Sequence, residues 1–199
     1  MDSRSLFEAP AQRPSIERLL FGPNVAINGP LDDGTVQVFL ETLQKVRTDG
    51  EDLVMELETS GGDDDAAGRI AAELRVFQRH SGRPAFCVGK SKVYGAGVTI
   101  FAAFPHQHRF LTEDAVLLVR ERRLEKSIEL DGPIKSSIQI VREQLALLET
   151  EEQLEMAGFE ELVAGSSLTA AQMYERALAN GYIHADEALT LGLVAEILR

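Results

Sequence analysis

A serine between two lysines, in Lys90-Ser91-Lys92, is the first group in the sequence that could act as a nucleophile. A lysine that is shielded from water can activate a neighbouring serine by accepting its proton. In an extended segment, however, adjacent side chains point to opposite sides of the backbone. We therefore predict a polar, solvated loop here, with a Ser–Lys dyad at Ser91 as the alternative.

Two groups of residues could contribute ligands to a metal ion. His106 and His108 would face one side of a strand, but a metal needs a third ligand, and a surface turn explains the pair more simply. The run Asp63-Asp64-Asp65 follows a Gly-Gly turn, where acidic side chains stabilise the positive end of a helix dipole. This run would also repel a phosphate-rich ligand such as coenzyme A. We predict no metal site and no cofactor.

The charge of the chain limits the classes of partner that it can bind. Its 199 residues carry 20 Lys and Arg against 32 Asp and Glu, and the net charge of -12 argues against nucleic acid and membrane surfaces. The single cysteine, Cys87, lies in an apolar run and is predicted to be buried. The sequence contains no signal-peptide pattern and no apolar run near the ~20 residues of a membrane span, so we predict a cytoplasmic protein.

Strands and helices alternate along most of the chain. Residues 1–17 are polar, contain two prolines and are predicted to form a flexible arm, whereas 18–199 are predicted to form a single domain. Repeated strand–helix units of this length imply parallel strands joined by right-handed crossovers. The predicted strands are 25–27, 53–57, 85–88, 115–119 and 191–194, and the predicted helices are 31–46, 63–81, 95–104, 170–178 and 185–188.

A long helix is predicted to start after Asp131-Gly132-Pro133. Its apolar residues recur at intervals of four and three, a 3.5-residue period that is typical of a helix packed along another helix. This apolar stripe consists of Ile134, Ile138, Val141, Leu145 and Leu148. We predict a projecting helix that makes contacts between subunits. The alternative is a helix whose stripe folds back onto its own domain.

Three blocks of the sequence resemble the Clp protease proteolytic subunit family of the Clp-protease/crotonase superfamily. The blocks are Glu58-Thr59-Ser60-Gly61-Gly62 with Ala67-Gly68, then Gly95-Ala96-Gly97-Val98-Thr99-Ile100-Phe101-Ala102-Ala103, then Asn180-Gly181-Tyr182-Ile183-His184-Ala185-Asp186-Glu187-Ala188 with Gly192-Leu193-Val194. They occur in the family's order, and weaker likeness extends from about residue 18 to the C-terminus. The resemblance implies an α/β fold built as a spiral of β-β-α units, with a long projecting helix in the second half.

The resemblance also shows which catalytic residues to look for. The family's serine attacks a carbonyl group, its histidine accepts the serine proton, and its aspartate orients the histidine. In this sequence those positions fall on Gly95, Arg120 and Asn180. Glycine has no nucleophile, arginine with a pKa above about 12 cannot act as a base, and asparagine cannot stabilise an imidazolium by charge. A second alignment places Val93 at the serine position and supplies no nucleophile either, so we predict that the triad is not intact.

Part of the family's site depends only on the backbone. The resemblance implies that the N–H groups of Gly62 and Ala96 bind the oxyanion, and no particular side chain is needed for this. Tyr94, next to Gly95, could place a hydroxyl group near the missing nucleophile, although packing explains it more simply.

Three functions follow from these observations. The first is a degenerate Clp-protease-like subunit that forms a homo-oligomer and modulates an active Clp-type partner or binds peptides. The second is a hydrolase or acyl-thioester enzyme of the same superfamily with rebuilt catalytic residues. The third is a scaffolding protein that acts through its long helix. Nucleic acid and membrane are not expected as partners in any of them.

Overall fold

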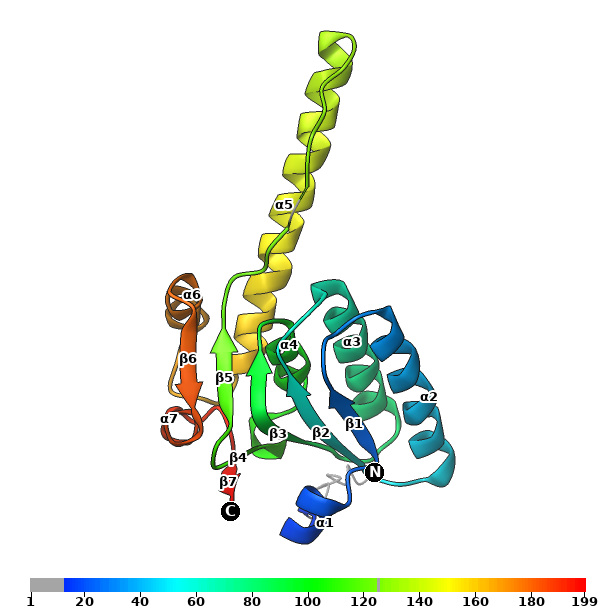
Figure 1. Ribbon diagram of the computed structural model, residues 1–199, viewed down its shortest axis with the longest axis vertical. Helices are drawn as coiled ribbons and strands as arrows, with labels where there is room; N and C mark the ends of the chain where they lie inside the picture. The colour runs from blue at the N-terminus through cyan, green and yellow to red at the C-terminus, as the bar shows by residue number, and fades with distance from the viewer. Residues whose placement is uncertain (1–12, 125) are drawn as a thin grey trace, which may run out of the picture.

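A seven-stranded sheet forms the centre of the computed structural model, which describes residues 13–124 and 126–199 (Figure 1). Neighbouring strands follow the order β1-β2-β3-β4-β7, and β5 and β6 extend the sheet from β3. The β5–β6 pair is antiparallel and the other described pairs are parallel. The strands are β1 (Val25–Asn28), β2 (Leu53–Thr59), β3 (Ala85–Tyr94), β4 (Arg109–Thr112), β5 (Val116–Val119), β6 (Gly181–His184) and β7 (Glu196–Leu198).

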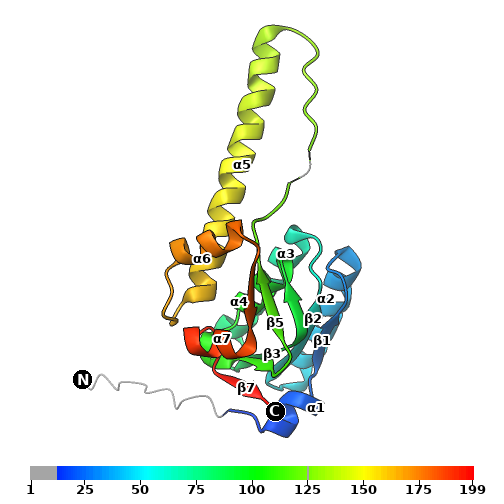
Figure 2. The same ribbon diagram turned by 60° about the vertical axis from the view of Figure 1, so that its left-hand side comes forward.

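Helices cover both faces of this sheet to different extents (Figure 2). Most of the core lies on the face that is packed by α2, α3 and α4, and a smaller apolar cluster on the other face is closed by Leu19 of α1. The helices are α1 (Ile16–Phe21), α2 (Asp33–Asp49), α3 (Asp64–His80), α4 (Ala96–Ala102), the 3-10 helix η1 (His106–His108), α5 (Ile134–Val163), α6 (Ala170–Leu178) and α7 (Ala185–Leu191). This mixed α/β architecture with a parallel sheet and one long helix confirms the predicted fold class.

Local sequence accounts for several of these elements. The first five residues of β3 are buried, as expected for a continuous apolar run between two layers of helices. Helices α2 and α3 each begin after an aspartate, Asp32 or Asp63, whose side chain accepts a hydrogen bond from a backbone N–H of the first turn. Cys87 is buried in β3, as predicted.

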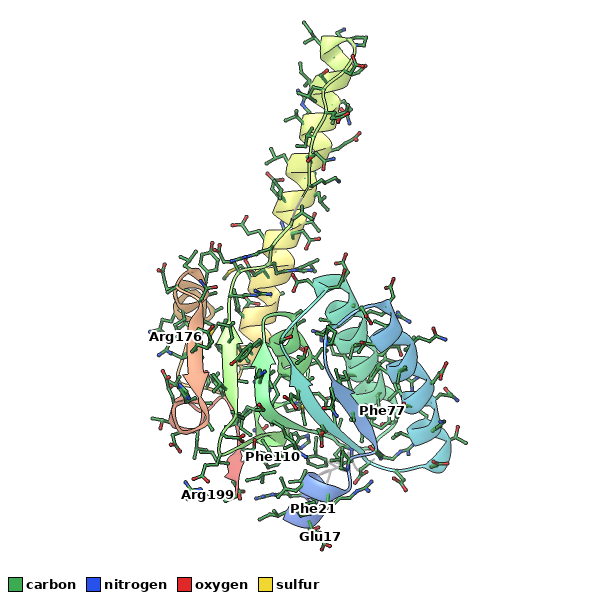
Figure 3. All side chains as sticks on the ribbon, viewed as in Figure 1. Glu17, Phe21, Phe77, Phe110, Arg176 and Arg199 are labelled. Carbon is green, nitrogen blue, oxygen red and sulfur yellow. The ribbon has the colours of Figure 1, made fainter. Side chains whose placement is uncertain are left out.

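The long helix α5 projects away from the sheet, and the segment that precedes it runs alongside it (Figures 1 and 2). Its outer part carries side chains that contact neither the sheet nor the helices on it (Figure 3). The five residues of the apolar stripe are between 46% and 79% exposed, whereas the last turns bury Phe159 and Leu162. The prediction of a projecting helix is confirmed, and the alternative, in which the stripe folds back, is wrong.

Three predicted boundaries differ from the structure. Strand β3 continues past residue 88 to Tyr94, so Lys90, Ser91 and Lys92 belong to a strand and not to a solvated loop. The last strand is Glu196–Leu198 instead of 191–194, because α7 runs on to Leu191 and ends at a left-handed Gly192. The four-residue strands β4 and β6 were not predicted.

The folded part of the chain begins nearer to the N-terminus than predicted. Helix α1 begins at Ile16, so the boundary predicted at residue 18 falls inside it. Before this helix, Arg13 pairs with Glu196 of β7. Residues 1–12 of the predicted arm lie outside the described residues. In the described parts of the chain, no helix is long and apolar enough to cross a membrane.

Candidate functional site

The turn after β2 brings backbone groups to one end of the sheet. Gly62 forms a parallel bridge with Leu31, in which the Leu31 N–H donates to Gly61 and the Asp63 N–H donates to Leu31. These bonds use the carbonyl group of Gly61 and the N–H of Asp63, and neither of them uses the Gly62 N–H. A Cβ atom on Gly62 would lie 2.3 Å from the carbonyl oxygen of Leu31, so only glycine fits here.

The second part of the site is the turn between β3 and α4. Gly95 stands at this turn with φ 53° and ψ -117°, a conformation that side chains rarely adopt. A sharp, strained strand-to-helix turn is also where α/β-hydrolases present their nucleophile, with the following N–H in the oxyanion hole. The turn of this chain is likewise a strand-to-helix turn, with glycine at its apex and Ala96 as the first residue of α4. Val93 of the second alignment lies before the turn, buried within β3.

Arg120 fills the space in front of this turn. A Cβ atom on Gly95 would lie 2.7 Å from Nε and 3.1 Å from Nη2 of Arg120, both closer than van der Waals contact. The same guanidinium group would lie 3.5 Å from a Cβ atom on Gly61. Arg120 therefore lies between the two glycine turns, where a side chain of residue 95 would have to stand.

A cavity of about 130 Å³ joins these parts of the site. Gly62, Gly95, Ala96 and Arg120 line it, so four of the five predicted triad and oxyanion positions come together. Its apolar wall comes from α4 and α5 and contains Val98, Leu154 and Phe159.

Asn180 lies at the same end of the sheet but outside the cavity. The antiparallel register pairs Val119, the last residue of β5, with Gly181, the first residue of β6. Arg120, which follows β5, and Asn180, which precedes β6, therefore lie at neighbouring strand ends. Asn180 itself is exposed, has φ 53°, and is absent from the described cavity lining. The third triad position is thus near the second, but its side chain is not part of the pocket.

The two predicted substitutes for the nucleophile are also not part of the described lining. The ring of Tyr94 packs edge-on against Tyr182 of β6, with 5.9 Å between ring centroids. Ser91 has φ 52° and lies in a bulge of β3 between Gly89 and Val93. These two residues pair with Leu57 and Thr59 of β2. Lys90 does not face Ser91 but binds Glu56, with Nζ 2.6 Å from the carboxylate, so the geometry does not support a Ser–Lys dyad.

The histidine pair does not form a metal site. His106 and His108 belong to the 3-10 helix η1, not to a strand, and Nδ1 of His108 lies 3.0 Å from the carbonyl oxygen of Ala85. His108 is half-buried against Phe86 instead of lying on a surface turn, and burial lowers its pKa. In residues 13–124 and 126–199, no cluster of His, Cys, Asp and Glu could hold a metal ion.

Two carboxyl groups that the sequence did not single out as chemical groups also line the cavity. Asp64 stands in the first turn of α3 and Glu155 in the middle of α5, and both are half-buried. Burial raises the pKa of each carboxyl group, and Arg122 partly opposes this shift. Carboxyl groups with raised pKa values can serve as general acids or bases. The position of Asp64 shortly after the Gly-Gly turn could have indicated that it lies near the site. No feature of the sequence indicates that Glu155 lies there.

Comparisons with known proteins support the fold. No family model matches the sequence, and no curated protein matches it. Among solved structures, a mutant of ClpP1 from Listeria monocytogenes is similar, with a TM-score of 0.65 and 18% sequence identity over 88% of this chain and 90% of that one. At this identity the match shows a ClpP-like fold and does not by itself carry a function.

Proposed function

We propose that this chain is a Clp-protease-like subunit that assembles with other subunits but has no serine protease activity. Its cavity would bind peptide segments without cleaving them, and its role would be structural or modulatory, with further copies of itself or with an active Clp-type partner. The lone buried cysteine agrees with our expectation of a reducing, cytoplasmic setting.

The position of the Arg120 guanidinium group is the observation that carries this proposal. It lies 2.7 Å from where a Cβ atom of residue 95 would stand, and Arg120 itself stands where the family has its histidine, so a guanidinium group takes the place of both the serine side chain and its base. The backbone turns at Gly62 and Gly95 line the same cavity, which supports an oxyanion site between them. Such a site can hold a peptide carbonyl group, but it supplies no attacking atom.

Purified full-length protein should neither hydrolyse peptide and ester substrates nor react with a fluorophosphonate probe. Loss of the serine or histidine costs a subtilisin-type enzyme roughly a millionfold in turnover, which is below detection in such assays. Hydrolysis is followed by fluorescence and labelling by mass spectrometry, with an active serine peptidase as the positive control. Labelling of any serine of this chain, together with hydrolysis, would overturn the proposal.

The half-buried Asp64 and Glu155 favour a second candidate, an enzyme of the same superfamily with rebuilt chemistry. Two carboxyl groups beside an oxyanion site could transfer protons to and from a bound carbonyl compound. The same experiment separates the two candidates. Hydrolysis without fluorophosphonate labelling, abolished by Asp64→Asn or Glu155→Gln, would replace the first candidate with this one.

A further inference from the structure

The residues that follow β5 form one wall of the cavity. We call residues 120–124 the strap, because they leave the end of β5 and pass between the start of α3 and the middle of α5. Four of them, Arg120 to Arg123, line the cavity opposite Val98 and Phe159. Within the described chain, the strap has no regular secondary structure, so side-chain contacts hold it in place.

Arg122 makes the contacts that join the strap to both neighbouring helices. Its guanidinium group lies 3.1 Å from Glu151 of α5, 3.4 Å from Asp65 and 3.9 Å from Asp64 of α3. Its backbone N–H donates a 2.6 Å hydrogen bond to Glu155. The side chain is only 24% exposed, so these interactions are weakly screened by water.

The surroundings of the strap are strongly acidic. Apart from Arg122, the strap carries Arg120, Glu121 and Arg123, and the hydroxyl group of Tyr174 on α6 donates to Glu121 at 3.4 Å. The acidic residues that line this region from the helices are Asp63, Asp64 and Asp65 on α3 and Glu149, Glu151, Glu152 and Glu155 on α5. Arg122 therefore holds together two helices whose facing charges repel each other.

We propose that the strap is a gate over the cavity, and that Arg122 latches it shut by holding it to α3 and α5 against the repulsion among the surrounding carboxylates. The gate would control access to the cavity whatever the cavity binds, so it goes beyond the proposed function and can fail independently of it. At neutral pH the contacts of Arg122 outweigh the repulsion and the gate is closed.

Thiol labelling of a residue inside the cavity tests the latch. Thr99 lines the cavity and is half-buried, so Thr99→Cys places a reactive group in the cavity wall. Cys87 is fully buried, and the chain without the new thiol gives the background rate. In the Thr99→Cys chain, Arg122→Gln should increase labelling by neutral iodoacetamide about tenfold, as expected when charge-assisted hydrogen bonds are lost.

The neighbouring Arg123 provides the matched control. It also lines the cavity, but it is exposed, and no ion pair holds it among the described residues, so Arg123→Gln should leave the rate unchanged within about twofold. Urea unfolding of each variant shows that the chains are equally folded. Equal rates for the two variants would overturn the assignment of Arg122 as the latch.

Discussion

Replacing Arg109 with leucine should lower the free energy of unfolding by at least about 3 kcal/mol, measured by urea denaturation. Arg109 is the largest fully buried side chain in the described structure, with 1% of its surface exposed. Leucine would remove all of its hydrogen-bond donors and leave a set of buried carbonyl oxygens without a partner. Each unsatisfied buried group of this kind costs about 1–3 kcal/mol.

The contacts of Arg109 explain this large expected effect. Its guanidinium group donates hydrogen bonds to the carbonyl oxygens of Ala102, Phe104, Glu161, Leu162 and Leu193. Four of these oxygens belong to the ends of α4 and α5 or to residues just beyond them, where a positive charge also opposes the negative end of the helix dipole. Burial lowers the pKa of Arg109 to about 10, so the group stays charged at neutral pH.

Arg79 is the control for this substitution. It is an exposed arginine near the end of α3, and Arg79→Leu should change the free energy of unfolding by no more than about 0.5 kcal/mol. A loss of less than about 1 kcal/mol in Arg109→Leu would mean that water replaces the lost donors. Arg109 would then not be the residue that ties α4 and α5 to the sheet.

Introducing two glutamates into the apolar stripe of α5 should dissociate the proposed assembly of subunits. We expect its dissociation constant to rise at least about a hundredfold. Ile138 and Leu145 lie two turns apart on one face and are 46% and 53% exposed in the single chain. If stripes of two subunits pack together, Ile138→Glu with Leu145→Glu buries like charges in a self-complementary contact, which costs several kcal/mol. Sedimentation velocity over a range of concentrations measures the effect.

A matched variant places the same charges on the opposite face of α5. Gln139 and Ala146 are exposed and lie outside the stripe, so Gln139→Glu with Ala146→Glu should leave the assembly intact. All four positions are exposed in the single chain, so neither variant should unfold it. A wild-type chain that sediments as a monomer at high concentration would show that the stripe is not an interface and would remove the main support for assembly.

Periodicity in the sequence was sufficient to predict the long helix and the class of fold. The stripe from Ile134 to Leu148 predicts a helix, but the sequence left open whether it projects or folds back, and the structure shows it exposed. Continuous apolar runs such as residues 85–88 likewise predicted strands covered on both sides. In each case, the spacing of apolar residues predicts the element locally.

The bulge in β3 could not be predicted from local composition. Lys90, Ser91 and Lys92 are polar, and Ser91 adopts a positive φ that the sequence does not announce. The strand continues through them because it changes partners, pairing with β4 up to Gly89 and with β5 from Lys92. Such a change depends on how three strands are arranged in the sheet, which local composition does not encode.

The composition of the site was predictable only in part. The spacing of the resemblance placed Gly95 and Arg120 correctly at one end of the sheet, but not the direction of the Arg120 side chain. That direction depends on the missing Cβ atom of Gly95, which leaves space for the guanidinium group. Glu155 enters the cavity only because α5 returns to the sheet after its outer part, a long-range feature that no motif marks.

A double-mutant cycle between Gly95 and Arg120 tests most directly whether arginine occupies the place of the nucleophile. Gly95→Ala strains the backbone in any background, since φ stays positive, but it contacts the guanidinium group only when Arg120 is present. We expect Gly95→Ala to cost about 1 kcal/mol more in the wild-type chain than in Arg120→Ala, measured by urea unfolding. Costs that agree within about 0.3 kcal/mol would show that Arg120 does not resist a side chain at residue 95 and would contradict our explanation for the missing nucleophile.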